Sequence, residues 1–135
     1  MMLRSLPLLW LSAVFLGAGH NQAVAQHMNV PGVPCHKPST TADEASCFAK
    51  ALEAADVEMN GVSARIRSVL NPNEREELLE AQRAWLKYRD LTCTAEYHRY
   101  SGGTGGPVTR FACLSAVTQE RVATLKTTYG WRLEK

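Results

Sequence analysis

The sequence has 135 residues, enough for one domain, with 15 basic and 13 acidic side chains and a formal charge of +2. Without Arg4, which lies in a leader segment, 14 basic residues face 13 acidic ones, and no basic stripe is interleaved with aromatic residues. This balance argues against a nucleic-acid partner.

The first 25 residues are typical of a secretory signal peptide. Arg4 supplies a charged start, residues 6–18 form an apolar run, and residues 23–25 (Ala-Val-Ala) form a small-x-small cleavage site. The run is shorter than the roughly 20 apolar residues that a membrane-spanning helix needs. We therefore expect cleavage after Ala25 and a periplasmic or secreted protein without stable membrane insertion.

All four cysteines follow this leader: Cys35, Cys47, Cys93 and Cys113. An even number of cysteines in a small exported domain predicts two disulfides. Successive cysteines are separated by 11, 45 and 19 residues, with no Cys-x-x-Cys pair, which is unlike a zinc site. We expect no metal and no cofactor, and we expect His27 to be a solvent-exposed residue.

Residues 26–40 are rich in proline and glycine and predict an irregular N-terminal arm. Residues 41–44 (Thr-Ala-Asp-Glu) predict a helix start with Thr41 as the N-cap. Apolar side chains then recur at steps of three and four from residue 45 to residue 69, which predicts a helix over residues 42–70. Gly61 costs this helix about 1 kcal/mol, so we expect a neighbouring helix to pack closely there.

Asn71 and Pro72 predict the end of the first helix and the cap and first turn of a second, which reaches about Tyr97. Residues 101–107 contain four glycines within five positions and predict a loop. Pro107 then opens a third helix, which Gly130 ends.

The predicted fold is all-α: three antiparallel helices in a small disulfide-braced bundle, with the arm packed across one end. The expected organisation is a signal peptide (residues 1–25), an arm (26–40), a helical domain (41–130) and a tail (131–135).

The second helix carries polar residues on the face that should point into the bundle. Residues equidistant from a short turn lie level in antiparallel helices. Arg89 is then level with Ala54 of the first helix and with Thr118 of the third, and Asp56 is about 3 Å further along the axis. We expect Asp56, Arg89 and Thr118 to form one polar layer.

The same argument places Gln82 level with Gly61 and beside Asn60, in a second polar layer that Arg121 can join from the third helix. Such layers are costly unless every member is paired. Arginine does not titrate, and neither layer contains a histidine, a second carboxylate or an activated nucleophile. We therefore interpret both layers as structural and expect no catalytic residue.

The same turn argument also places the four cysteines at one end of the bundle. Cys93 and Cys113 lie symmetrically about the second turn, and Cys35 and Cys47 lie symmetrically about the junction of the arm and the first helix. Pairing within these two sets is the first choice. Cys47 is also level with Glu96, so Cys47–Cys93 with Cys35–Cys113 stays open.

At this point several linked motifs resemble the LprI-type lysozyme inhibitor family, over residues 35–125. They are Thr-Thr-Ala-Asp-Glu-Ala-Ser-Cys at 40–47, Ala-Asp-Val-Glu-Met-Asn at 55–60, Ala-Gln-Arg-Ala-Trp-Leu-Lys-Tyr-Arg-Asp-Leu-Thr-Cys at 81–93, Gly-Gly-Thr at 102–104, Ala-Cys-Leu at 112–114 and Thr-Gln-Glu-Arg at 118–121. Met59 departs from the leucine that the family shows more often, and no lipid-anchor cysteine follows the leader. The resemblance implies an exported bacterial protein that binds and inhibits lysozyme without catalysis.

Lysozymes work with two carboxylates in a cleft, and a projecting element with hydrogen-bond donors can occupy such a cleft. We expect this role for the second loop, where an arginine can bind carboxylates, a tyrosine can anchor and glycines allow close approach of the backbone. The predicted contact residues are Arg99, Tyr100, Ser101, Gly102, Gly103 and Thr104.

Two alternatives remain open. The acidic start of the second helix, formed by Glu74, Glu76, Glu77 and Glu80, could attract a basic lysozyme instead. The chain could also be a periplasmic binding module for another envelope protein or for a peptidoglycan fragment.

Overall fold

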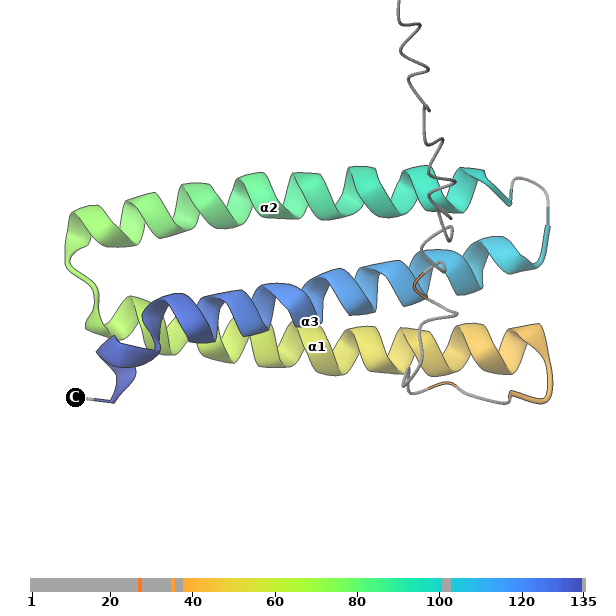
Figure 1. Cartoon of the computed structure of the whole chain (residues 1–135), viewed down its shortest axis with the longest axis horizontal. Coiled ribbons are helices and arrows are strands. Elements are labelled where there is room, and N and C mark those ends of the chain that lie inside the picture. Colours follow the sequence, from red (N-terminus) through yellow and green to blue (C-terminus); the bar gives the residue numbers. More distant parts are fainter. Residues whose placement is uncertain (1–26, 28–34, 36–37, 101–102, 135) are drawn as a thin grey trace, which may run out of the picture.

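The structure, a computed structural model, describes residue 27, residue 35 and residues 38–100 and 103–134. Three helices follow one another: α1 (Thr41–Val69), α2 (Pro72–His98) and α3 (Gly105–Leu133). The described residues contain no strand, so the predicted all-α fold of three antiparallel helices is confirmed (Figure 1). The predicted signal peptide and most of the arm lie outside the described residues.

The N-cap of α1 is Thr40, one residue before the predicted Thr41. Thr40 has extended backbone angles, and its Oγ1 accepts a hydrogen bond from the Asp43 N–H at 3.1 Å. Asn71 caps α2 as predicted: its Oδ1 accepts from the Glu74 N–H, and Glu74 accepts from the Asn71 N–H in return. Both starts satisfy N–H groups that have no partner within the helix.

Two predicted limits of α3 are wrong. The helix begins at Gly105, so Pro107 falls within its first turn, where the N–H that proline lacks has no partner within the helix. It also passes Gly130 and ends at Leu133, so most of the predicted tail is helical. Gly130 lies within the helix and does not adopt the left-handed φ angle with which a glycine commonly ends one.

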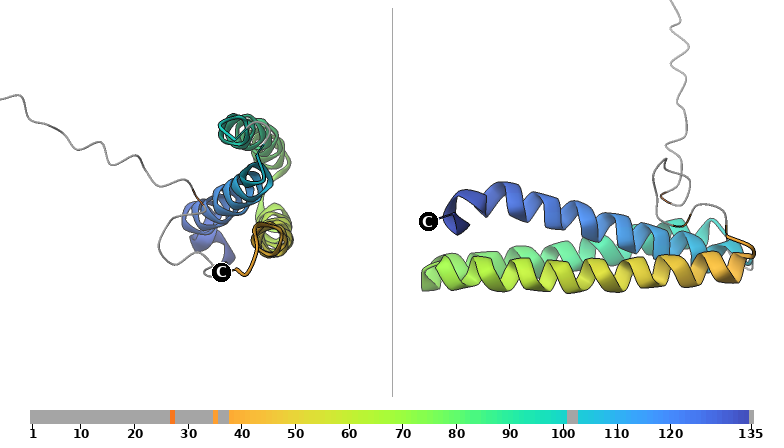
Figure 2. Two further views of the ribbon diagram at one scale, coloured as in Figure 1. Left: turned by 90° about the vertical axis from the view of Figure 1, so that its right-hand side faces the viewer. Right: turned by 90° about the horizontal axis from the view of Figure 1, so that it is seen from below.

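Helix α3 is the central helix of the molecule. Eleven of its residues are buried, against five in α1 and two in α2. It packs against both other helices, and the end-on view in Figure 2 shows it between them. The close helix packing expected at Gly61 is wrong, because Gly61 is exposed with open space around it.

The apolar stripe of α1 faces α3, and its members Phe48, Ala55, Met59, Val62 and Ile66 are buried. At the end of the molecule that holds the α1–α2 turn, Met59, Val62 and Ile66 join a cluster with Leu78 and Val122. Smaller clusters around Phe48 and around Cys93 occupy the other end.

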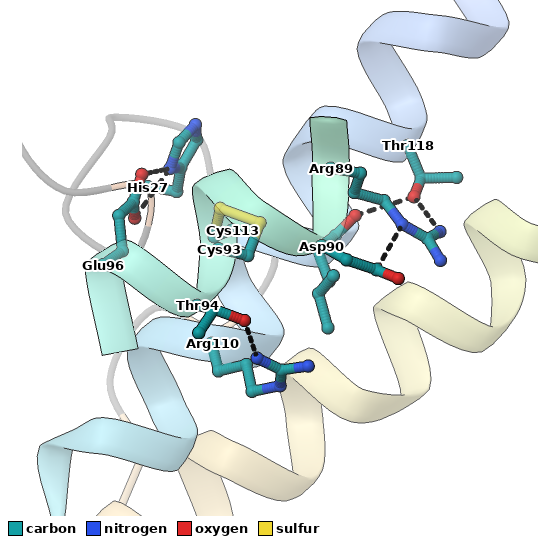
Figure 3. Close-up of a disulfide and its surroundings, with 10 residues drawn as sticks. His27, Arg89, Asp90, Cys93, Thr94, Glu96, Arg110, Cys113 and Thr118 are labelled. Atoms are coloured by element: carbon teal, nitrogen blue, oxygen red, sulfur yellow. Dashed lines mark hydrogen bonds and ion pairs between the residues drawn. A yellow bond between two sulfur atoms is a disulfide. The ribbon is translucent and has the colours of Figure 1, made fainter. Parts of the chain in front are cut away.

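Two disulfides brace that other end. Cys35 is joined to Cys47, with a Cα–Cα distance of 5.8 Å, and Cys93 to Cys113, with a Cα–Cα distance of 5.5 Å. This is the first of the two pairings considered from the sequence. The second disulfide links α2 directly to α3 just before the turn between them (Figure 3).

Candidate functional site

Arg89 of α2 connects all three helices. Its Nη1 donates to Asp56 Oδ1 in α1 and to Thr118 Oγ1 in α3, both at 2.9 Å. The Thr118 hydroxyl in turn donates to the Leu114 carbonyl at 2.7 Å. Figure 3 shows Arg89 reaching across to Thr118. The structure thus brings together Asp56, Arg89 and Thr118.

The rest of the Arg89 guanidinium is held by weaker contacts. Its Cζ lies 5.1 Å from the centre of the Trp85 ring, within the range of a cation–π interaction. Its buried Nε lies 3.6 Å from Asp90 Oδ1, too far for a hydrogen bond, and has no hydrogen-bond partner among the described residues. The guanidinium is therefore fixed mainly through one nitrogen and the indole face.

Gln82 occupies a second polar layer. Arg121 Nε donates to Gln82 Oε1 at 2.7 Å, and Gln82 Nε2 donates to Ser63 Oγ at 3.2 Å. Asn60 is not part of this layer: it is exposed and lines a pocket between α1 and α2. Burial lowers the pKa of Arg121, and its guanidinium lies 5.9 Å from the Trp85 ring.

The sequence analysis missed Ser63 because the turn argument paired each residue of α2 with a residue of α1 two positions too early. Both α1 partners, Asp56 and Ser63, lie two residues beyond the positions expected to be level with Arg89 and Gln82. Asp56 was included because a distance of two residues is within reach of an arginine, and the same distance from Gly61 leads to Ser63.

The two layers offer little chemistry beyond their own bonds. The Thr118 hydroxyl already accepts from Arg89 and donates to a carbonyl, and the Asp56 carboxylate is paired with Arg89. A nucleophile needs an adjacent base, which this geometry does not supply. The arrangement is suited to fixing three helices relative to one another.

His27 is not the solvent-exposed residue expected. Its Nδ1 lies 2.9 Å from Glu96 Oε1, and both side chains are partly buried (Figure 3). Among the described residues, the group with spacing suitable for a metal is His27, Glu96 and Cys113. Cys113 is bound in a disulfide and offers no thiolate, so this group is a poor metal site.

The predicted contact loop lies at the disulfide end, between α2 and α3. Arg99 is the C-cap of α2 and is exposed, as are Gly103 and Thr104. Tyr100 is partly buried, with its ring over Gly105, where an added Cβ would meet it at 3.1 Å. Ser101 and Gly102 lie outside the described residues.

Gly106 has a similar role for a second tyrosine. A Cβ on this buried residue would lie 2.9 Å from the ring of Tyr97, closer than real Cβ contacts allow. Gly105 and Gly106 therefore make room for two tyrosine rings against the start of α3. The sequence predicted a loop at both positions, whereas both glycines lie in the first turn of α3.

The acidic start of α2 has one member with a structural role. Glu74 completes the cap of α2 and also pairs with Arg132 at 2.6 Å. The hydrogen bond from the Asn71 backbone and the charge of Arg132 lower the pKa of Glu74. Glu76, Glu77 and Glu80 are exposed.

None of the three helices has a segment long and apolar enough to cross a membrane.

Comparison with known proteins gives the class of this chain. Residues 35–125 match the sequence model of the family described as "Lysozyme inhibitor LprI". The match covers more than half of the chain, so the protein belongs to the LprI family. It is also 28% identical over 109 residues to an uncharacterized protein of Rhizobium meliloti (strain 1021). The aligned region covers 71% of this chain and 78% of that relative. No solved structure matches.

Proposed function

We propose that the protein inhibits lysozyme by binding it, without catalysis, through the turn between α2 and α3. Family membership carries this proposal. The turn suits the role because the Cys93–Cys113 disulfide and the packed ring of Tyr100 hold both sides of it. A loop whose two ends are held in place loses less conformational entropy on binding.

Arg99 is the residue of the turn best placed to meet a carboxylate. It is exposed, and its guanidinium can donate two parallel hydrogen bonds to a catalytic carboxylate in the cleft. The sequence predicted that Tyr100 anchors the partner, but its ring packs against Gly105 at the start of α3 and so supports the turn. The exposed Gly103 and Thr104 are the other expected contacts.

The direct test is a cell-wall lysis assay with the purified, oxidised protein against several types of lysozyme. We expect inhibition of at least one type, and we expect Arg99→Ala to raise the inhibition constant at least about fivefold, equivalent to roughly 1 kcal/mol. Arg83→Ala is the matched control, since Arg83 is an exposed arginine of the same helix, about 24 Å from Arg99 along the axis.

Lack of inhibition of every lysozyme at excess inhibitor would reject the proposed function. Equal potency of Arg99→Ala and Arg83→Ala would reject the turn as the binding element while leaving inhibition in place. The acidic start of α2 would then be the next surface to change.

We also propose that the protein is exported to the periplasm or the medium after cleavage behind Ala25. The mass of the exported chain tests this directly, since the mature protein should begin at Gln26.

A further inference from the structure

A second pocket lies at the opposite end of the molecule from the turn between α2 and α3. It has a volume of about 200 Å³ and lies between the start of α2 and the last turns of α3, over the buried side chain of Leu70. The length of α2, 27 residues or about 40 Å, separates it from the turn (Figure 1). Its other lining residues are Glu74, Glu77, Thr128, Tyr129, Trp131 and Arg132.

Trp131 is the notable member of this pocket. It is 56% exposed, although an indole usually buries most of its surface. The Arg132 guanidinium lies 4.8 Å from the centre of the indole, and Arg132 is itself held by its 2.6 Å ion pair with Glu74. The exposed ring therefore belongs to an ordered arrangement and presents apolar surface to solvent.

Hydrogen-bonding groups line the same pocket. Glu77 is exposed on α2, and Thr128 is exposed on α3. Glu74 and Arg132 pair with each other, and each retains further acceptor or donor positions. The pocket thus combines an aromatic face with carboxylates, a guanidinium and a hydroxyl.

We propose that this pocket binds one pyranose ring of a glycan. A sugar ring has an apolar face of C–H groups and a rim of hydroxyls that both donate and accept. The Trp131 indole can cover the apolar face, while Glu77 accepts from hydroxyls and Arg132 donates to them.

Other small ligands fit this pocket less well. The two carboxylates of Glu74 and Glu77 repel an anion. Arg132, paired to Glu74, repels a metal cation. An acyl chain would need a deeper apolar cavity than the partly buried Tyr129 and the exposed Trp131 provide. A neutral, hydroxyl-rich ring matches both the aromatic face and the mixed charges.

This proposal does not depend on lysozyme inhibition, but the two functions would support each other. Lysozyme cleaves a glycan, and an inhibitor held on that glycan would be concentrated where the enzyme acts. The pocket and the turn lie at opposite ends, so both could be occupied at once.

The test uses the oxidised, exported protein with tri-N-acetylchitotriose and cellotriose as soluble probes, measured by calorimetry. A second arm measures co-sedimentation with insoluble peptidoglycan. We expect saturable binding of at least one probe, weakened about tenfold by Trp131→Ala and by Glu77→Ala. Trp131→Phe should retain part of the affinity, and Arg99→Ala should bind like the unchanged protein.

Binding of a soluble probe without co-sedimentation would assign the pocket to free saccharides and support the proposal. Binding that Trp131→Ala leaves unchanged would overturn it, as would no binding of any probe at millimolar concentration. Trp131 is 56% exposed, so its replacement should leave the protein folded, and the melting temperature of each variant checks this. Loss of glycan binding with intact lysozyme inhibition would reject this pocket only.

Discussion

The role of Arg89 can be tested by replacing it with methionine. This change keeps an unbranched side chain of similar length but removes the hydrogen bonds to Asp56 and Thr118 and the cation–π contact with Trp85. Breaking a buried ion pair typically costs 3–5 kcal/mol. The expected loss here is smaller, because the Asp56 side chain is 39% exposed and can be rehydrated.

A single hydrogen bond to a charged group contributes about 1.5–3 kcal/mol. The Arg89 side chain is only 14% exposed, so both of its bonds lie in a poorly hydrated setting. Part of this loss in unfolding free energy is offset, because the substitution removes the unpaired Nε and buries an apolar methionine side chain. We therefore expect the free energy of unfolding to fall by about 2 kcal/mol.

The measurement is urea unfolding of the oxidised protein, followed by helical circular dichroism. Arg83→Met is the control, since Arg83 is exposed on the same helix and its replacement should change stability by less than about 0.5 kcal/mol. A loss for Arg89→Met no greater than that of the control would show that the polar layer contributes nothing to stability. Folded Arg89→Met should retain lysozyme inhibition, and a loss of inhibition in the folded protein would mean that Arg89 has more than a structural role.

Three further changes test other parts of the structure. Gly61→Ala should stabilise the protein by about 1 kcal/mol in urea unfolding, whereas Gly106→Ala should destabilise it by about 1–3 kcal/mol, because its Cβ would collide with a tyrosine ring; the same sign for both would refute this reading of the glycines. Replacing Cys93 and Cys113 by alanine should lower the unfolding free energy by about 3 kcal/mol, and an unchanged midpoint would contradict this. The lowered pKa of Glu74 means that its carboxylate stabilises the fold above the pKa it has in the unfolded chain, and that this contribution is lost as the pH falls through its folded value. The stability difference between wild type and Glu74→Gln should therefore shrink on acidification, and a difference independent of pH would contradict the assignment.

The helices could be predicted from the sequence because their signals are local. Periodic apolar residues marked α1, and Asn71 with Pro72 marked the start of α2. Turn symmetry was enough to bring Arg89 near Asp56 and Thr118, because the rise of a helix is constant.

The lateral arrangement of the helices could not be predicted in the same way. A short turn fixes which helices are antiparallel, but side-chain volume decides how far apart they lie. Tyrosine rings occupy the space beside Gly105 and Gly106, and no periodicity reports that contact. The pocket around Trp131 was missed because Gly130 was taken as the end of α3, which left Trp131 in a tail.

Helix α2 is attached to the molecule mainly by polar and covalent bonds. Only Leu78 and Cys93 are buried along its length, so the apolar area that holds it to α3 is small. Its position instead depends on the Cys93–Cys113 disulfide and on arginine contacts distributed from Arg132 near its start to Arg110 near its end. Apolar contacts tolerate sliding, whereas the disulfide prevents it and the directional arginine contacts would be lost if α2 moved by one residue. The disulfide and the polar contacts together therefore define the axial position of α2 relative to α3, and with it the position of Arg99 at the end of α2.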